Sequence, residues 1–184
     1  DLPYPGGPAI QEAARAGSPT AFKLPRAWLP GTYDFSFSGL KTAVLRTVHK
    51  YRPEGNDRAA ARSNDAGPQT PPVVRALPVG NLAASFQAAV VDVLAEKTVQ
   101  AAIEFDARMI LLAGGVAANE ALRREVRDRS PVPTRYPPPS LCTDNAAIIA
   151  SAGFFRFQAG DRSGWDLDVI PGLRLPEEAA VETS

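Results

Sequence analysis

Apolar side chains recur every three to four residues between residues 81 and 105. This spacing places them on one face of a helix, and Asn81 is a residue type that often caps a helix N-terminus. We therefore expect one long helix over this range. Its apolar positions are Leu82, Phe86, Val90, Val93, Leu94, Val99 and Ile103.

The next apolar segment, residues 109–113, is short and unbroken. Such a run is typical of a strand that is covered on both faces. Gly114 and Gly115 interrupt it, and residues 117–129 return to a helical pattern. This order predicts a buried strand, a tight turn and a second helix.

Prolines separate that helix from the last predicted elements. A brief strand is expected near Tyr136, and a helix capped by Thr143 is expected to reach about Gln158. The tail beyond the helix is loop-like, and we expect it to fray after Pro176. Because helices and strands alternate over residues 81–158, the pattern predicts an α/β layer architecture.

The N-terminal part of the chain is rich in turn-forming residues. Residues 1–8 contain three prolines and two glycines, and a short helix is expected over residues 8–16. Aromatic and polar side chains alternate over residues 33–37, which predicts a strand with one buried face. An amphipathic pattern then predicts a helix over residues 39–51.

Residues 53–72 contain no Val, Ile, Leu, Met or aromatic side chain. Ordering a backbone costs about 1 to 2 kcal/mol per residue, and this segment has too little apolar surface to offset that cost. We expect a flexible surface loop, to which we assign no function.

The composition excludes several classes of protein. The 184 residues carry 20 Lys or Arg and 20 Asp or Glu, so nucleic-acid binding must come from a local patch or from a partner. One Cys excludes a disulfide framework, and no apolar run approaches the roughly 18 residues of a membrane span. We expect a cytoplasmic location without membrane contact. Because the chain opens on Asp1, we also expect a processed product or a fragment.

The glycine-rich turn is the first candidate site. Gly114 and Gly115 let the backbone approach a ligand closely, and the N–H groups at a helix start favour an anion. Asn119, one turn into the predicted helix, has an amide that can bond a sugar hydroxyl or a phosphate. The alternative is an ordinary tight turn with a solvent-facing Asn, which the local pattern favours.

Asp144 is the second candidate. In the first turn of a helix, its carboxylate is a possible metal ligand, or it stabilises the helix dipole and does nothing more. His49 is the only His and has no paired ligand at helical spacing, so further metal ligands must come from outside this chain. Cys142 has no local His, and we expect it to be buried and inert.

Basic residues form two smaller candidates. An excess of arginines over residues 123–135 is explained most simply by a solvated helix face, with tRNA contact as the less favoured alternative. Lys41 can reach a phosphate near the start of its helix or can be an ordinary exposed lysine.

Five short motifs occur along the chain: Tyr4–Pro8, Asp34–Thr42, Ala84–Gln87, Leu112–Asn119 and Cys142–Ala146. In this order they resemble the C-terminal half of the tRNA N6-adenosine threonylcarbamoyltransferase family. Each motif alone is weak, but five in the same order are specific. The resemblance covers nearly the whole chain outside residues 53–80 and the last few residues.

The resemblance implies the fold and the reaction. The family has a two-lobed actin-like/Hsp70-like ATPase (ribonuclease H-like) fold with the ligand between the lobes. Residues 1–184 would form the second lobe, and the first lobe is absent. The reaction moves a threonylcarbamoyl group from threonylcarbamoyl-adenylate to N6 of the adenosine next to the anticodon in tRNAs that read ANN codons. Bacterial partner proteins of the threonylcarbamoylation complex are implied as well.

The resemblance also implies roles for particular residues. Gly7 and Asn119 would touch the adenylate, and Gly114 and Gly115 would form the close-approach turn. Asp144 would bind one iron or zinc ion, whose other ligands are two histidines of the first lobe. We therefore expect these residues to converge on one crevice and the isolated chain to be inactive. No residue is assigned as the general base.

Two other functions are compatible with the sequence. One is a non-catalytic lobe, or degenerate relative of the same fold, that binds a partner protein. The other is a nucleotide-binding kinase or ATPase lobe, because a Gly-Gly turn before a helix suits any nucleotide.

Overall fold

The computed structural model describes residues 2–51 and 76–172. It divides into two units, Asp1–Asp144 and Asn145–Ser184. The loop predicted over residues 53–72 and the fraying predicted after Pro176 lie outside the described residues.

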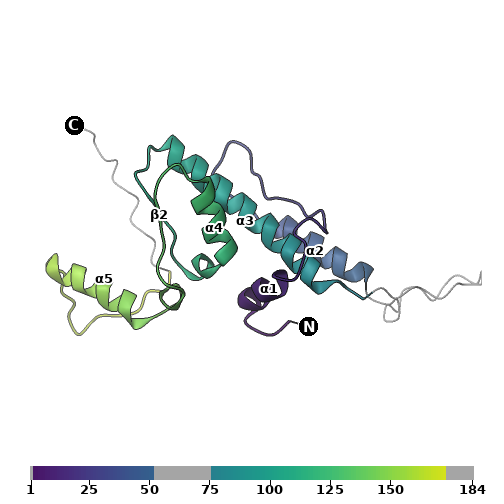
Figure 1. Cartoon of the computed structure of the whole chain (residues 1–184). Coiled ribbons are helices and arrows are strands. Elements are labelled where there is room, and N and C mark those ends of the chain that lie inside the picture. The colour runs from purple at the N-terminus through teal and green to yellow at the C-terminus, as the bar shows by residue number, and fades with distance from the viewer. Residues whose placement is uncertain (1, 52–75, 173–184) are drawn as a thin grey trace, which may run out of the picture. The chain divides into compact units, whose positions relative to one another are not determined.

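One long helix, α3 (Val79–Glu104), organises the first unit. It contacts α1 (Gly6–Ala14), α2 (Ser38–Lys50) and α4 (Glu120–Arg129), which lie along it in Figure 1. Because different helices pack along its length, α3 buries residues on several sides rather than along one stripe. The predicted long helix and the predicted helix over residues 39–51 are confirmed.

Two helix starts differ from the prediction. α3 begins two residues before Asn81, and Asn81 is not its cap, because Asn81 Oδ1 accepts a hydrogen bond from Ser18 N–H at 2.9 Å. α1 begins at Gly6 rather than Pro8 and ends at Ala14, so part of the expected turn is helical.

The sheet of the first unit has two short parallel strands in the described residues, β1 (Ile110–Leu111) and β2 (Thr134–Arg135). A 3₁₀ turn, η1 (Gly115–Ala118), and α4 connect them, as parallel pairing requires. The prediction that β1 is covered on both faces is wrong. Ile110 is buried against α3 and α4, whereas Leu111 is 73% exposed, because a two-stranded sheet with helices on one side leaves its other face open.

Three apolar clusters hold the first unit together. One joins α3, β1 and α4, a second joins α2 and the 22–24 segment to α3, and a third joins α1 to α3. Their buried members are Val91, Ala95, Ala102, Ile110, Leu122 and Val126; Leu24, Leu40, Leu82 and Ala89; and Ala14, Ala83 and Ala84. Alanines dominate the α1–α3 contact, so these two helices approach closely.

Residues 33–37 do not form the predicted strand. A buried lysine of α3 binds the loop that leads into this segment, and within the segment it bonds the carbonyl group of Asp34. Lys97, 6% exposed, donates to the carbonyl oxygens of Leu29 (3.1 Å), Thr32 (2.7 Å) and Asp34. The ammonium therefore fixes an irregular loop where the alternation of aromatic residues indicated a strand.

The second unit contains α5 (Ala146–Gln158). Its N-cap is Asn145, whose Oδ1 accepts from Ile148 N–H at 3.1 Å, so the predicted cap at Thr143 is wrong. At the C-terminal end of α5, Arg156 forms an ion pair with Asp161 at 2.8 Å. No helix in the described part of either unit is long and apolar enough to cross a membrane.

Candidate functional site

The glycine turn after β1 has an unusual backbone. Gly114 has φ 81° and ψ 174°, a region that is essentially restricted to glycine. Its carbonyl accepts from Ala117 N–H at 3.0 Å, which starts η1. The N–H groups of Gly115 and Val116 precede that bond and donate to no backbone carbonyl of the described residues. A Cβ on Gly114 or Gly115 would meet nothing within 4 Å, so the turn is open.

Asn119 is the N-cap of α4 rather than a residue one turn inside it. Its Oδ1 accepts from Leu122 N–H at 2.9 Å, and its Nδ2 donates to Gln87 Oε1 at 2.9 Å. The prediction that the helix begins at residue 117 is therefore wrong, because residues 115–118 form the 3₁₀ turn. Gln11 of α1 accepts a further bond from Glu120 N–H at 3.2 Å, so side chains already satisfy the start of α4.

Gly7 lies in the first turn of α1, which has no side-chain cap. A Cβ at Gly7 would also meet nothing within 4 Å. The backbone at this helix start is therefore accessible, as it is at the glycine turn.

Asp144 is the last residue of the first unit and is exposed. It precedes the N-cap of α5, so the prediction that it lies in the first turn of that helix is wrong. Among the residues that the structure describes, no hydrogen bond or ion pair engages its carboxylate, and no three His, Cys, Asp or Glu side chains are grouped to hold a metal. Asp144 can supply one ligand, not a site.

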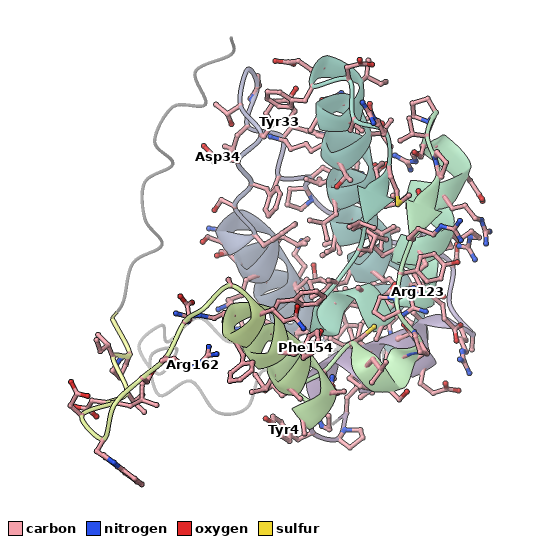
Figure 2. All side chains as sticks on the ribbon, turned by 90° about the vertical axis from the view of Figure 1, so that its left-hand side faces the viewer. Tyr4, Tyr33, Asp34, Arg123, Phe154 and Arg162 are labelled. Atoms are coloured by element: carbon pink, nitrogen blue, oxygen red, sulfur yellow. The ribbon has the colours of Figure 1, made fainter. Side chains whose placement is uncertain are left out.

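Arg123, labelled in Figure 2, connects the two candidate motifs. It donates to the carbonyl oxygen of Ala117, at the end of the glycine turn, and to Cys142 Sγ at 3.1 Å, two residues before Asp144. It also donates to Pro137 O at 3.0 Å and lies over the ring of Tyr136, 4.5 Å from its centroid. Sequence reasoning missed this role, because nothing in the pattern distinguishes Arg123 from its neighbouring arginines.

Two of the other arginines of α4 form short ion pairs, and the third, Arg124, lies 3.9 Å from Glu125. Arg129 pairs with Asp92 at 2.9 Å and with Glu125 at 3.0 Å, and Arg127 pairs with Asp128 at 3.1 Å. This arrangement favours a structural role over tRNA contact on α4. Cys142 is buried, as predicted.

A pocket of about 520 Å³ lies between α1, α3 and α4. Gln11 and Gln87, the partners of the α4 start, belong to its lining, together with charged residues of both signs. None of the five residues that the resemblance assigns to the adenylate or the metal lines it, whereas Arg124 and Arg129 of the arginine-rich segment do. Gly114, Gly115 and Asn119 share one turn, and their convergence with Gly7 and Asp144 stays a prediction.

A parallel strand that ends in an open glycine turn before a helix is the arrangement with which α/β proteins bind phosphate-bearing ligands. Comparison with known proteins identifies the family more specifically than this arrangement does. Residues 1–151 match the family model for TsaD, tRNA N6-adenosine threonylcarbamoyltransferase. The chain belongs to this family.

Individual relatives agree with the family model. The chain is 58% identical to the tRNA N6-adenosine threonylcarbamoyltransferase of Thermomicrobium roseum over 174 residues, which are 95% of this chain and 48% of that protein. It is 49% identical to the protein of the same name from Dehalococcoides mccartyi, with 95% and 46% covered. The chain thus spans about half the length of the curated relatives that it matches.

Proposed function

We propose that this chain is the second lobe of a two-lobed, actin-like transferase. The complete protein moves threonylcarbamoyl from threonylcarbamoyl-adenylate to N6 of the adenosine next to the anticodon in tRNAs that read ANN codons. The family match over residues 1–151 carries this proposal. Coverage of just under half of each relative supports the division into lobes, with the first lobe supplied by the rest of the protein.

In this proposal the glycine turn holds the phosphate of the adenylate. The N–H groups of Gly115 and Val116 are free for an anion, and the glycine-only backbone of Gly114 presents them. Gly7 offers a second accessible backbone at the start of α1. Asn119 contacts the adenylate when its Nδ2 exchanges Gln87 for a ligand oxygen, while its Oδ1 continues to cap α4.

Asp144 fits the role of one metal ligand. Its carboxylate is exposed, and an oxygen donor suits iron or zinc. The remaining ligands lie outside this chain, so the isolated chain is inactive. When bound, the ion acts as a Lewis acid on the acyl carbonyl. The residues of this chain position the substrate: the adenine amine is a weak nucleophile, so holding the adenylate in line provides much of the acceleration.

The proposed reaction also implies the partners and the cellular location of the protein. The chain acts with tRNA and with partner proteins of the threonylcarbamoylation complex in the cytoplasm, without membrane contact.

A chimera tests the proposal. The corresponding half of the Thermomicrobium roseum relative is replaced by this chain, and formation of threonylcarbamoyladenosine on an unmodified tRNA is measured. We expect activity from the chimera and none from the isolated chain. Asp144→Asn should abolish the activity, whereas Asp168→Asn, at another exposed carboxylate, should leave it unchanged. A well-folded chimera without activity, or an active Asp144→Asn variant, contradicts the proposal.

A further inference from the structure

The exposed face of α2 carries basic side chains that have no acidic partner among the residues that the structure describes. Lys41, Arg46, His49 and Lys50 are all exposed, and α2 contains no Asp or Glu. No ion pair joins Lys41, Arg46 or Lys50 to another described residue. The contrast with α4 is clear, because Arg127 and Arg129 there face carboxylates at 3.1 Å or less.

The opposite face of α2 fixes this orientation. Leu40 is buried, and Val44 and Val48 pack into the same apolar cluster against α3. The basic side chains are therefore directed to solvent by the packing of the helix. A helix rises about 1.5 Å and turns about 100° per residue, so Lys41 and Lys50 are about 14 Å apart along the axis and lie at opposite edges of the exposed half of α2, with Arg46 and His49 between them.

An exposed aromatic side chain precedes the start of α2. The loop that carries Tyr33 and Asp34 leads into α2 (Figure 2), and Lys97 fixes it through three carbonyl groups. Phe35, 48% exposed, packs on Phe37 at a centroid distance of 5.7 Å, immediately before the helix. Cations beside an exposed aromatic ring are the combination that binds the backbone and unstacked bases of RNA.

We propose that this basic face of α2, with Phe35 at its N-terminal end, binds tRNA through the phosphate backbone. The inference rests on the proposed function, which supplies tRNA as the substrate. Residues 38–50 carry three Lys or Arg and no Asp or Glu, whereas the whole chain has no net charge. Charge complementarity thus favours this face for a polyanion.

Fluorescence anisotropy with the 184-residue chain and a labelled, unmodified tRNA tests the surface. The variant Lys41→Ala/Arg46→Ala/Lys50→Ala should weaken binding at least about tenfold near 0.1 M salt and lower the slope of log K against log salt by about 2 to 3. Alanine favours helix, so circular dichroism should show α2 retained. The matched control is Arg15→Ala/Arg124→Ala/Arg127→Ala, which removes the same charge from ion-paired positions and should change binding less than twofold.

Several outcomes overturn the inference. They are equal weakening in the control and the α2 variant, no tRNA binding by the parent chain, and binding of phosphatidylserine vesicles in place of tRNA. Failure here is distinguishable from failure of the proposed function. An active chimera with unchanged tRNA affinity in the α2 variant overturns only the surface, and an inactive chimera with the expected loss of affinity overturns only the transferase.

Discussion

Asn119 donates its side-chain amide to Gln87 Oε1 at 2.9 Å and so joins the start of α4 to the middle of α3. The other atom of the same amide accepts from Leu122 N–H at 2.9 Å. One side chain therefore caps a helix, fixes that helix to its neighbour and ends the glycine turn. Both of its polar groups are satisfied without a ligand.

The first prediction concerns how much each of the two side-chain hydrogen bonds of Asn119 contributes to stability. Asn119→Asp keeps the cap, and Gln87 can rotate its amide to donate to the new carboxylate, so we expect the free energy of unfolding to change by less than about 0.5 kcal/mol. Asn119→Ala removes both bonds and should cost about 1 to 2 kcal/mol. Urea unfolding monitored by circular dichroism measures both. Equal losses in the two variants would show that capping by this side chain contributes little to stability.

Lys97 gives the second prediction. Lys97→Met keeps the apolar stem and removes the ammonium, which leaves the carbonyl groups of Leu29, Thr32 and Asp34 without their donor. We expect a loss of about 2 to 3 kcal/mol in the free energy of unfolding. Lys23→Met, at an exposed lysine, is the control and should change it by less than about 0.5 kcal/mol. A loss of similar size in both variants would argue against the role of the buried ammonium.

Local patterns were sufficient to predict most of the helices. The apolar stripe that the sequence indicates along α2 comprises Leu40, Val44, Leu45 and Val48. Leu40 is buried and Val44 and Val48 pack against the same cluster, whereas Leu45 is 56% exposed, so the stripe is narrower than predicted. The family motifs and the turn at Gly114 were also predictable, because glycine-only backbone is a local property. The tertiary contacts that these elements make could not be predicted from the local sequence.

The errors share a physical cause, which is a partner far along the chain. Asn81 is a good cap by type, but Ser18 uses its oxygen, and the amide acts between segments instead. The alternating aromatics of residues 33–37 indicate a strand, yet the carbonyl groups of Thr32 and Asp34 accept hydrogen bonds from Lys97 of α3. The roles of Gln87 and Arg123 likewise depend on residues 32 and 19 positions away, which no local pattern shows.

The pH dependence of stability gives the third prediction, through Asp92. Burial alone raises the pKa of this carboxyl, but hydrogen bonds and charge from Arg26 and Arg129 outweigh burial and hold its pKa below 3.8. A lowered folded-state pKa stabilises the fold above the unfolded-state pKa of about 3.9, and this contribution is lost as pH falls through the folded value. Protonation of Asp92 in acid should therefore weaken its ion pairs with Arg26 and with Arg129 of α4.

Urea midpoints at about pH 7, 4 and 2.5 check this expectation. Asp92→Asn should be less stable than the parent at neutral pH and should lose less stability between the two acid values. Asp128→Asn is the control at an exposed carboxylate and should follow the parent curve. Parallel curves for the parent and Asp92→Asn would contradict the assignment.

The contact between Gly17 and Gly80 gives the fourth prediction. A Cβ on Gly17 would overlap the backbone carbonyl of Gly80, at the point where the chain leaves α1 and passes the start of α3. Backbone cannot move aside as a flexible side chain can, so Gly17→Ala should lower the free energy of unfolding by about 2 to 3 kcal/mol. Gly80→Ala should be milder, because its Cβ would be 3.2 Å from Ala13 O.

Gly39→Ala is the matched control for Gly17→Ala. A Cβ at Gly39 would meet nothing within 4 Å, and Gly39 lies inside α2, where alanine is the better helix former. We expect Gly39→Ala to raise the free energy of unfolding by up to about 1 kcal/mol. Because α1 also supplies Gln11 to the start of α4 and Gly7 to the proposed adenylate site, Gly17→Ala should weaken adenylate binding in the chimera as well as stability. Unchanged stability in Gly17→Ala would show that α1 and α3 are not held as closely as described, and would remove the support that α1 gives to the site.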